Sequence, residues 1–362
     1  MQWLREHFEL DRGGGDHNLR PMEGLRGGAV FLVFLVHYVS LIAPWIDAKS
    51  TAWSVAEFLR TIGHTGVDLF FVLSGYLIYG ALIVRPRPMV PYFRRRIMRL
   101  YPAFTVVFFV YIMLSILFPF ENKVSNGPWQ GFVYLLENFL LLPGIFPIEP
   151  MITVTWSLSY EAFYYIAIPI IIGTFALRKW PSSRRILFFV VIGIVLAALH
   201  EQLGQRTRLV MFLAGIVLWE HRELGGLRTP SEAAGVVAVL AGFAVVNLPL
   251  SLGLRYGLLA VAFHLFCFAS LAPNGRGLLN RALCWTPLRW LGNMSYSYYL
   301  LHGLALKAAF RALARFLPPT HGLGGFTFGA GMAPLFVLTL VPTALLFLAV
   351  ERPMSLAPRR HK

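Results

Sequence analysis

The sequence predicts an all-α, polytopic membrane protein, a bundle of about ten transmembrane helices. Of its 362 residues, 57% are hydrophobic and only 14% are charged, and the mean hydropathy is +0.64. Soluble domains carry about 25% charged residues, and a soluble core of this size is too small to bury so much apolar surface. Apolar stretches close to the length of about 20 residues that crosses a bilayer also recur along the whole chain.

These stretches define ten predicted spans, of which the fifth and sixth are short. They cover residues 27–46, 65–84, 99–118, 153–176, 186–200, 207–220, 232–249, 254–272, 290–314 and 333–350. A further apolar stretch, 129–147, is interrupted by Pro143, Gly144 and Pro147. Broken backbone at membrane depth needs protein or water around it, so this stretch is predicted to be interfacial or re-entrant.

The distribution of basic residues predicts the orientation of the chain. If the N-terminus is inside, the inside segments hold 23 of the 32 Lys and Arg residues. Such an excess is typical of cytoplasmic loops, so we expect both termini in the cytoplasm and the protein in the bacterial cytoplasmic (inner) membrane. The predicted layout is a tail over 1–26, one transmembrane domain over 27–352 and a second tail over 353–362.

Composition also argues against other classes of protein. A formal charge of +15 is typical of nucleic-acid binding, but positive-inside bias explains it here, so we expect no nucleic-acid partner. The two cysteines, Cys267 and Cys284, do not resemble a disulfide or zinc framework, and no metal site is predicted. The first 26 residues lack the apolar stretch of a cleavable signal peptide.

Ionisable side chains inside membrane spans are costly, so each is a functional candidate. Arg26 stands at the cytoplasmic mouth of the first span, and His37 follows eleven residues later, on the same helix face and about 16 Å deeper. His37 is a candidate catalytic base, or a histidine that only bonds a neighbouring helix. Asp68, in the second span at a similar depth, is a candidate to orient the His37 imidazole, or a helix N-terminal acid favoured by the dipole.

Two further polar groups lie on the third and fourth spans. Arg95 and Arg99 share a helix face and suit a phosphate clamp, or snorkel at the interface; Arg94 and Arg96 are predicted to point elsewhere. Glu161 is a candidate catalytic or acceptor-positioning carboxylate, or the partner of an arginine on another span. It forms a polar stripe with Ser157 and Tyr164, and the aromatic residues Trp156, Tyr160 and Tyr165 are candidates to stack on a sugar or to belong to the aromatic belt. For His302 in the ninth span, helix–helix hydrogen bonding is the expected role.

Taken together, these residues resemble the membrane-bound acyltransferase 3 family over essentially the whole chain. The order and spacing of the motifs make the resemblance specific, although each motif is modest alone. They are Arg26 and His37 with ten residues between them, GVDLFFVLSGYLI at 66–78, YFRRRIMRLYP at 92–102, TWSLSYEAFYY at 155–165, LGNMSYSYYLLH at 291–302 and ERP at 351–353.

The resemblance implies transfer of an acyl group, usually acetyl, from acyl-coenzyme A to a hydroxyl of a glycan or similar acceptor. It implies that Arg26, His37, Arg95 and Arg99 carry the family's functional motifs, and that acetyl-coenzyme A is a co-substrate with no tightly bound cofactor. Many relatives add a soluble esterase-like domain, which is expected to be absent here because the chain ends about ten residues after its last predicted span.

Two other functions also fit parts of the pattern. Ten spans with buried Glu, His and Arg suit a proton-coupled transporter, but no inverted repeat is evident in the sequence. A structural scaffold leaves the aligned polar residues unexplained. The sequence does not name the acceptor, since lipopolysaccharide, exopolysaccharide, peptidoglycan and small antibiotics all offer hydroxyls.

Overall fold

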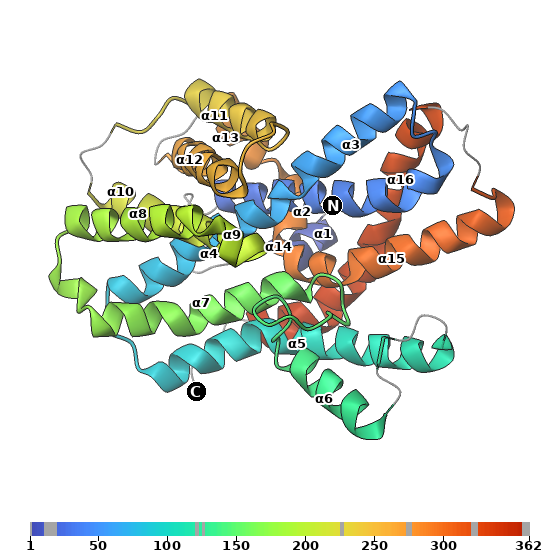
Figure 1. Ribbon diagram of the computed structural model, residues 1–362, viewed down its shortest axis with the longest axis horizontal. Coiled ribbons are helices and arrows are strands. Elements are labelled where there is room, and N and C mark those ends of the chain that lie inside the picture. The colour runs from blue at the N-terminus through green and yellow to red at the C-terminus, as the bar shows by residue number, and fades with distance from the viewer. Residues whose placement is uncertain are drawn as a thin grey trace.

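The computed structural model describes residues 2–10, 20–119, 123–124, 127–224, 228–272, 277–319 and 325–356, and within these ranges it contains helices and no β-strand. The all-α prediction is therefore confirmed, and Figure 1 shows the packed helices. A helix lies in each predicted span: α2 (Arg20–Ile42), α4 (Thr65–Ile83), α5 (Met89–Leu117), α7 (Thr155–Thr174), α8 (Ser182–Ala198), α10 (Val210–Glu223), α11 (Glu232–Val245), α12 (Leu252–Ser270), α15 (Ser295–Phe316) and α16 (Gly325–Leu346).

Several of these helices are long and apolar enough to cross a bilayer. Among the described residues, five segments meet both requirements, and they are Arg20–Trp45, Thr51–Ile83, Met89–Leu117, Leu252–Ser270 and Phe328–Leu356. The pair Ser182–Ala198 and His200–Glu223, bent by 73°, makes a sixth if it is one span. The chain is thus a multi-pass membrane protein, and the number of about ten spans and the cytoplasmic termini stay predictions.

The N-terminal segment packs on the helical bundle. It carries helix α1 (Gln2–Phe8), and α2 begins at Arg20, ahead of the predicted start of the first span. Arg289, on α14 (Thr286–Asn293), binds the carboxylates of Glu9 and Glu23, each at 2.9 Å. These ion pairs fix the segment before the first span against the start of the ninth. Residues 357–362 of the predicted C-terminal tail lie outside the described residues.

Three helices differ from the predicted bounds for local reasons. Helix α5 begins at Met89, because arginine favours helix and Pro91 falls in the first turn, where proline is tolerated. The ninth predicted span is interrupted at Met294, between α14 and α15. After α16 the chain continues as a segment with π-helical hydrogen bonding, Phe347–Leu356, which carries Glu351.

The stretch predicted to be interfacial or re-entrant is only partly helical. It forms α6 (Pro128–Phe139) and then leaves the helix. Leu141 and Gly144 take positive φ values of 56° and 95°, which end regular structure there. The irregular segment leads directly into α7 and the residues of the candidate site.

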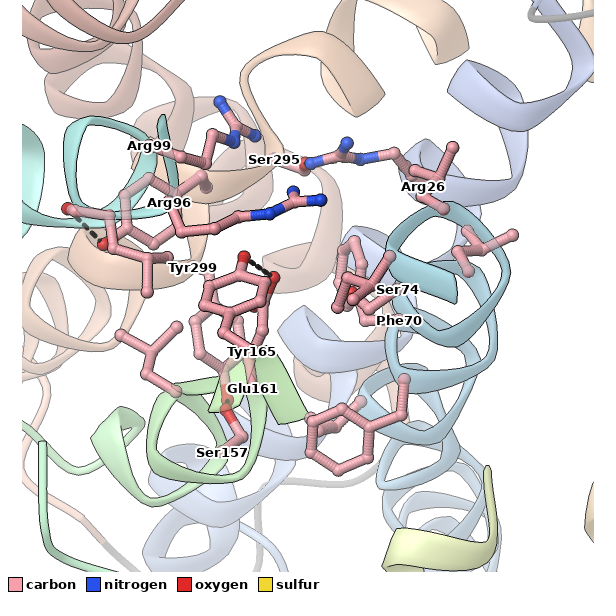
Figure 2. Close-up of a pocket in the computed structure, with 18 residues that line it drawn as sticks. Arg26, Phe70, Ser74, Arg96, Arg99, Ser157, Glu161, Tyr165, Ser295 and Tyr299 are labelled. Atoms are coloured by element: carbon pink, nitrogen blue, oxygen red, sulfur yellow. Dashed lines mark hydrogen bonds between the residues drawn. The ribbon is translucent and has the colours of Figure 1, made fainter. Parts of the chain in front are cut away.

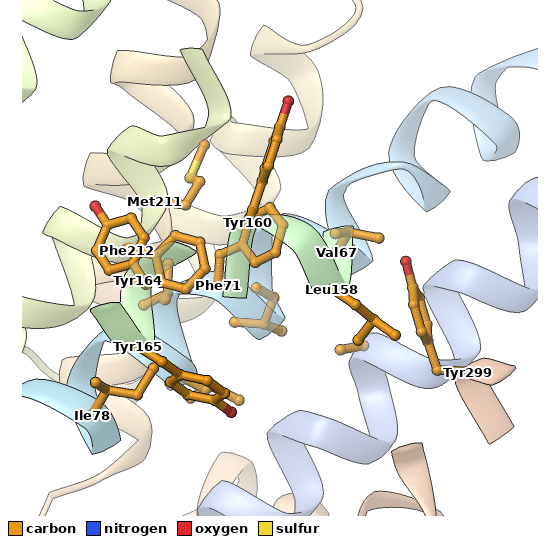
Figure 3. Close-up of a cluster of buried hydrophobic side chains, with 14 of the residues drawn as sticks. Val67, Phe71, Ile78, Leu158, Tyr160, Tyr164, Tyr165, Met211, Phe212 and Tyr299 are labelled. Carbon is orange, nitrogen blue, oxygen red and sulfur yellow. The ribbon is translucent and has the colours of Figure 1, made fainter. Parts of the chain in front are cut away.

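Helices α4 and α10 approach each other through glycine. A Cβ on Gly75 would lie 2.0 Å from the Phe212 carbonyl oxygen, and one on Gly215 would lie 2.0 Å from that of Val72. Only glycine allows this contact, as is common between membrane helices. Figure 3 shows the aromatic cluster beside this crossing, in which the Tyr164 ring stacks on Phe212 with centroids 3.8 Å apart.

Helices α2 and α15 lie side by side and run in the same direction (Figure 1). Three contacts follow one another along them. Arg26 donates to Ser295 at 2.9 Å, the His37 and His302 rings lie 4.7 Å apart, and Trp45 donates to the Leu317 carbonyl at 3.0 Å. These contacts define an axis with an Arg26 end, a His37 level and a Trp45 end.

Candidate active site

A cavity of about 150 Å³ lies at the Arg26 end of the axis, and we call it the arginine pocket. It is lined by Arg26 of α2, Arg96 and Arg99 of α5, Glu161 of α7 and Ser295 of α15. Figure 2 shows the three guanidinium groups at one end of the pocket, with Glu161 and Ser157 toward the other end. Its volume is below the usual 300–1,000 Å³ of ligand pockets, so it suits a thin segment of a ligand.

Each arginine of the pocket is held by a neighbouring element. Arg26 donates to Ser295 Oγ from both Nε and Nη2, at 3.2 and 2.9 Å. Arg99 pairs with Glu351 at 2.8 Å, and the Arg96 guanidinium lies 4.9 Å from the Tyr165 ring centroid. The arginines are therefore pre-positioned, and guanidinium forks held in this way match phosphate oxygens.

The other end of the pocket carries hydrogen-bonded oxygens. The Tyr165 hydroxyl donates to the Glu161 carboxylate, one helical turn away on α7. Ser157 Oγ lies 2.6 Å from the Tyr299 hydroxyl, which also donates to the Val154 carbonyl at 3.2 Å. Glu161 thus shares the pocket with three arginines.

A second and larger cavity, of about 920 Å³, opens beyond His37 toward the Trp45 end of the axis. Besides His37 it is lined by Lys123, Lys307, Arg311 and Arg315, and we call it the basic vestibule. Tyr299 lines the arginine pocket, and its chain neighbour Leu300 lines the vestibule. Ser157 also lines the arginine pocket, and Val154 of the same chain segment lines the vestibule.

His37 has a second histidine beside it at this junction. The His302 ring makes an edge contact with His37, and its Nδ1 lies 2.8 Å from the Tyr298 carbonyl oxygen. A carbonyl only accepts, so Nδ1 carries the proton and Nε2 of the neutral ring is an acceptor. That Nε2 is buried and has no hydrogen-bond partner among the described residues. We expected His302 to form a hydrogen bond between helices, but its Nδ1 bond stays within α15, and its Nε2 forms none among the described residues.

The chain matches the model of the acyltransferase domain family over residues 21–350. This chain belongs to that family. The resemblance inferred from the sequence motifs is confirmed.

Relatives of this chain are named for O-acetyl or acyl transfer. It is 26% identical to the peptidoglycan O-acetyltransferase OatA of Listeria monocytogenes, over 78% of this chain and 48% of the relative. It is 25% identical to O-acetyltransferase OatA of Staphylococcus aureus, over 82% and 52%, and 26% identical to acyltransferase MdmB of Streptomyces mycarofaciens, over 95% and 93%. The chain spans about half the length of the OatA relatives. No solved structure matches it significantly.

The structure brings together only some of the predicted site residues. Arg26, Arg99, Glu161 and Ser157 line one pocket, whereas His37 lines the vestibule. The two main catalytic candidates, His37 and Glu161, therefore line different cavities.

Asp68 does not orient His37, contrary to our expectation. Its carboxylate is fully buried and receives Arg208 Nη1 at 3.3 Å on both oxygens. Arg208 also donates to the Tyr256 hydroxyl at 2.7 Å. Because a buried carboxylate needs a partner, and this one is supplied from 140 residues away, the pairing has no signal in the local sequence.

Arg95 and the aromatic residues of α7 also differ from the predicted arrangement. Arg95 is exposed and does not line the arginine pocket, whereas Arg96, predicted to point elsewhere, does. Tyr164 donates to the Leu209 carbonyl at 3.1 Å, and Tyr160 packs against Phe71 (Figure 3). Trp156 packs edge-on to the same Phe71 ring. None of these three aromatic residues lines either of the two cavities.

Some lining residues were missed as site candidates by the sequence analysis. Arg96 precedes Arg99 by three residues, so helix spacing was the available signal for it. Tyr165, a candidate to stack on a sugar, does line the arginine pocket. Ser295 and Tyr299 enter the site through contacts with α2 and α7 more than 140 residues away. For these two, no local pattern indicates the neighbour.

Proposed function

We propose that this protein transfers an acetyl group from acetyl-coenzyme A to a hydroxyl of an extracytoplasmic or membrane-associated glycan. The observation that carries the proposal is the succession along α2 and α15 of a three-arginine pocket, the paired histidines His37 and His302, and a large open cavity. The names of the relatives, which include peptidoglycan O-acetyltransferase, support acetyl as the group and a glycan as the acceptor.

The donor is assigned to the Arg26 end. Coenzyme A carries its phosphates at one end and its thioester at the other, joined by a thin arm. Arg26, Arg96 and Arg99 supply charge-assisted contacts for phosphate at the pocket, and a volume of about 150 Å³ suits the arm better than the whole donor. The excess of Lys and Arg in the predicted inside segments supports a cytoplasmic position for this end.

The acceptor is assigned to the vestibule, with His37 as the group that handles the proton. In direct transfer, a His37 ring nitrogen takes the proton of the acceptor hydroxyl as the oxygen attacks the thioester carbonyl. The C–S bond then breaks, and the thiolate of coenzyme A takes up the proton. In the alternative, a His37 ring nitrogen attacks the thioester carbonyl, the C–S bond breaks and coenzyme A leaves as the thiolate. The acceptor hydroxyl then displaces His37 from the acetyl group, and the proton of the hydroxyl is taken up by the thiolate. In both routes the thioester has to pass the side chains around Tyr299.

His302 is the positioning residue for this step. Its Nδ1 proton is held by Tyr298, so its Nε2 faces the neighbourhood of His37 only as an acceptor. An acceptor there favours a His37 ring that presents one N–H toward His302 and keeps the other nitrogen for the acceptor hydroxyl. The ring contact of 4.7 Å between the two histidines supports this arrangement.

Several of the buried charges that suit proton-coupled transport are held in ion pairs. Asp68 is paired with Arg208 at 3.3 Å, and Glu220 is paired with Arg185 at 2.5 Å. Partnered buried charges of this kind stabilise a helical bundle without carrying protons, so acetyl transfer is the function that we retain.

The test is acetyl transfer by the purified protein in nanodiscs. Radiolabelled acetyl-coenzyme A and a peptidoglycan-derived oligosaccharide should yield labelled ester and free coenzyme A. The His37→Ala variant should bind donor normally and form no ester, while Thr61→Ala, a change at a hydroxyl that bonds its own helix at Glu57 and lines neither cavity, should behave as wild type. Transport of the oligosaccharide across the membrane of proteoliposomes without ester formation would support transport and refute the proposal.

A further inference from the structure

Glu351 is a buried carboxylate that the proposed mechanism does not use. It lies in the segment Phe347–Leu356, which has π-helical hydrogen bonding, and its side chain is fully buried. Helical turns of this kind are rare and occur frequently at functional sites. Glu351 does not line the arginine pocket itself, although its partner Arg99 does. Because a charge buried in a membrane bundle is costly, the contacts of this carboxylate indicate what it contributes.

Both oxygens of the Glu351 carboxylate are hydrogen-bonded. Oε1 accepts from Arg99 Nη1 at 2.8 Å, and Oε2 accepts from the backbone N–H and the hydroxyl of Ser297 at 3.0 and 2.6 Å. Ser297 lies in the first turn of α15, where backbone N–H groups have no partner within the helix and favour a negative charge. One carboxylate therefore joins a guanidinium of α5 to the beginning of α15.

The beginning of α15 also contacts a second arginine of the pocket. Ser295, two residues before Ser297, accepts from the Arg26 guanidinium at 2.9 Å. Glu351 thus fixes Arg99 directly, and through the first turn of α15 it helps to fix the serine that Arg26 contacts. Two of the three arginines of the pocket depend on the position of this one carboxylate.

The segment that carries Glu351 is held by the N-terminal helix. The Phe347 ring stacks on the Phe8 ring of α1 with centroids 5.7 Å apart, and Arg352 donates to the Glu6 carbonyl at 2.5 Å. These contacts lie on both sides of Glu351 in the sequence, so they fix the backbone that carries it. The carboxylate therefore has a defined position from which it can orient a neighbouring group.

We propose that Glu351 is a positioning residue of the donor pocket, and that it orients the Arg99 guanidinium toward the phosphates of acetyl-coenzyme A. This inference rests on the proposed function and adds a residue to its donor site. A guanidinium carries five N–H donors, and Glu351 bonds one terminal nitrogen, so the rest of the fork can bind a phosphate. Preorganisation of this kind raises affinity because less side-chain freedom is lost on binding.

Charge and position make opposite predictions for the loss of this carboxylate. A negative charge beside Arg99 weakens its attraction for phosphate, so by charge alone its removal would tighten donor binding. The guanidinium groups of Arg26, Arg96 and Arg99 lie at one end of the pocket (Figure 2) and repel one another. Without Glu351, the long Arg99 side chain could turn away from the others. We expect the loss of position to dominate, because phosphate recognition by arginine depends on the geometry of the fork.

The experiment compares Glu351→Gln with the wild-type protein in nanodiscs. Glutamine has almost the same shape but only one acceptor oxygen, so either Arg99 or Ser297 loses its partner. We expect the KM for acetyl-coenzyme A to rise about tenfold, with kcat near wild type. With S-acetylpantetheine, a donor that carries no phosphate, the two proteins should have equal kcat/KM. Glu220→Gln, which breaks another buried ion pair, that with Arg185, is the matched control and should leave the donor KM unchanged.

A double-mutant cycle tests whether Glu351 acts through Arg99. Arg99→Gln should weaken donor binding about tenfold or more, and Glu351→Gln/Arg99→Gln should bind no more weakly than Arg99→Gln alone, because residues that act as a unit are not additive. If Glu351→Gln does not fold, Ser297→Ala takes its place. This variant removes the 2.6 Å bond, keeps every charge and should raise the donor KM in the same direction.

Three results would overturn the inference. They are unchanged or tighter donor binding in the folded variants, an equal loss with S-acetylpantetheine, and additive losses in the double variant. A wild-type protein that binds no acetyl-coenzyme A would refute the proposed function together with this inference, whereas the three results above leave the proposed function intact.

Discussion

The Tyr299 hydroxyl lies 2.6 Å from Ser157 Oγ, in the wall between the arginine pocket and the basic vestibule. The same hydroxyl donates to the carbonyl of Val154, a residue that lines the vestibule. If the proposed donor reaches His37 from the arginine pocket, its thioester has to pass the Tyr299 hydroxyl. We therefore expect the bonds of this hydroxyl to restrict the passage, so that at least one of them has to break for transfer.

This restriction predicts a leak in variants that lack the bond. Tyr299→Phe keeps the ring and removes a hydrogen bond worth about 1 kcal/mol, so the open form should be about fivefold more populated. Hydrolysis of acetyl-coenzyme A in the absence of acceptor should rise by a similar factor. Tyr298→Phe, whose hydroxyl bonds Thr339 at 2.9 Å, is the control and should leave the rate unchanged. A wild-type rate in Tyr299→Phe would show that the bond does not limit access.

The arginines of α5 should differ sharply in their effect on the donor. Arg96→Ala and Arg99→Ala each remove a charge from the pocket. Because one charged contact contributes about 1.5–3 kcal/mol, donor affinity should fall about tenfold or more. Arg95→Ala, at an exposed position, should change it much less. Binding of acetyl-coenzyme A to the four variants, with Arg94→Ala included, is the measurement. A large loss in Arg95→Ala with none in Arg96→Ala would restore the arrangement expected from the sequence.

Replacing Asp68 should lower the stability of the folded protein and leave acetyl transfer unchanged. Asp68→Ala leaves Arg208 buried without its carboxylate, which typically costs about 3–5 kcal/mol. The double variant Asp68→Asn/Arg208→Gln removes both charges and should recover much of that loss. Thermal unfolding in detergent gives the stabilities, and acetyl transfer per folded molecule should stay near wild type. An Asp68→Asn protein that is stable and inactive would instead give Asp68 a catalytic role.

His302 should control the step at His37 without touching the donor. His302→Phe keeps a ring of similar size but removes the acceptor nitrogen, so we expect kcat to fall about tenfold or more with donor affinity unchanged, and the pH dependence of kcat to shift. His302→Gln, which offers an amide oxygen near the same place, should restore part of the rate. A purely structural histidine would lower the melting temperature and leave the pH profile of the folded fraction unaltered.

The sequence predicted where the helices lie better than it predicted which residues of different helices contact each other. Apolar length placed a helix in each of the ten predicted spans, and costly buried charge selected Arg26, Arg99 and Glu161, which share one pocket. The choice of Arg95 over Arg96 failed because successive residues of a helix point about 100° apart, and the packing of α5 decides which one faces inward.

Residue pairs that the fold brings together from distant parts of the chain could not be predicted from the sequence. Asp68 with Arg208 and Ser157 with Tyr299 are separated by about 140 residues of sequence, and helical periodicity says which face of a helix is polar but not which helix meets it. The same holds for His37 and His302, whose separate positions in two spans were visible while their contact was not.

The central claim is that the donor binds at the Arg26 end of the bundle and that the acetyl group is used on the opposite side of the membrane. Proteoliposomes with a single protein orientation test it directly, with acetyl-coenzyme A on one face and a peptidoglycan-derived oligosaccharide on the other. The account predicts ester only when the donor is at the Arg26 face and the acceptor at the opposite face, and none in His37→Ala. Ester formation with both substrates on the same face, at the same rate in the wild-type protein and in His37→Ala, would contradict it.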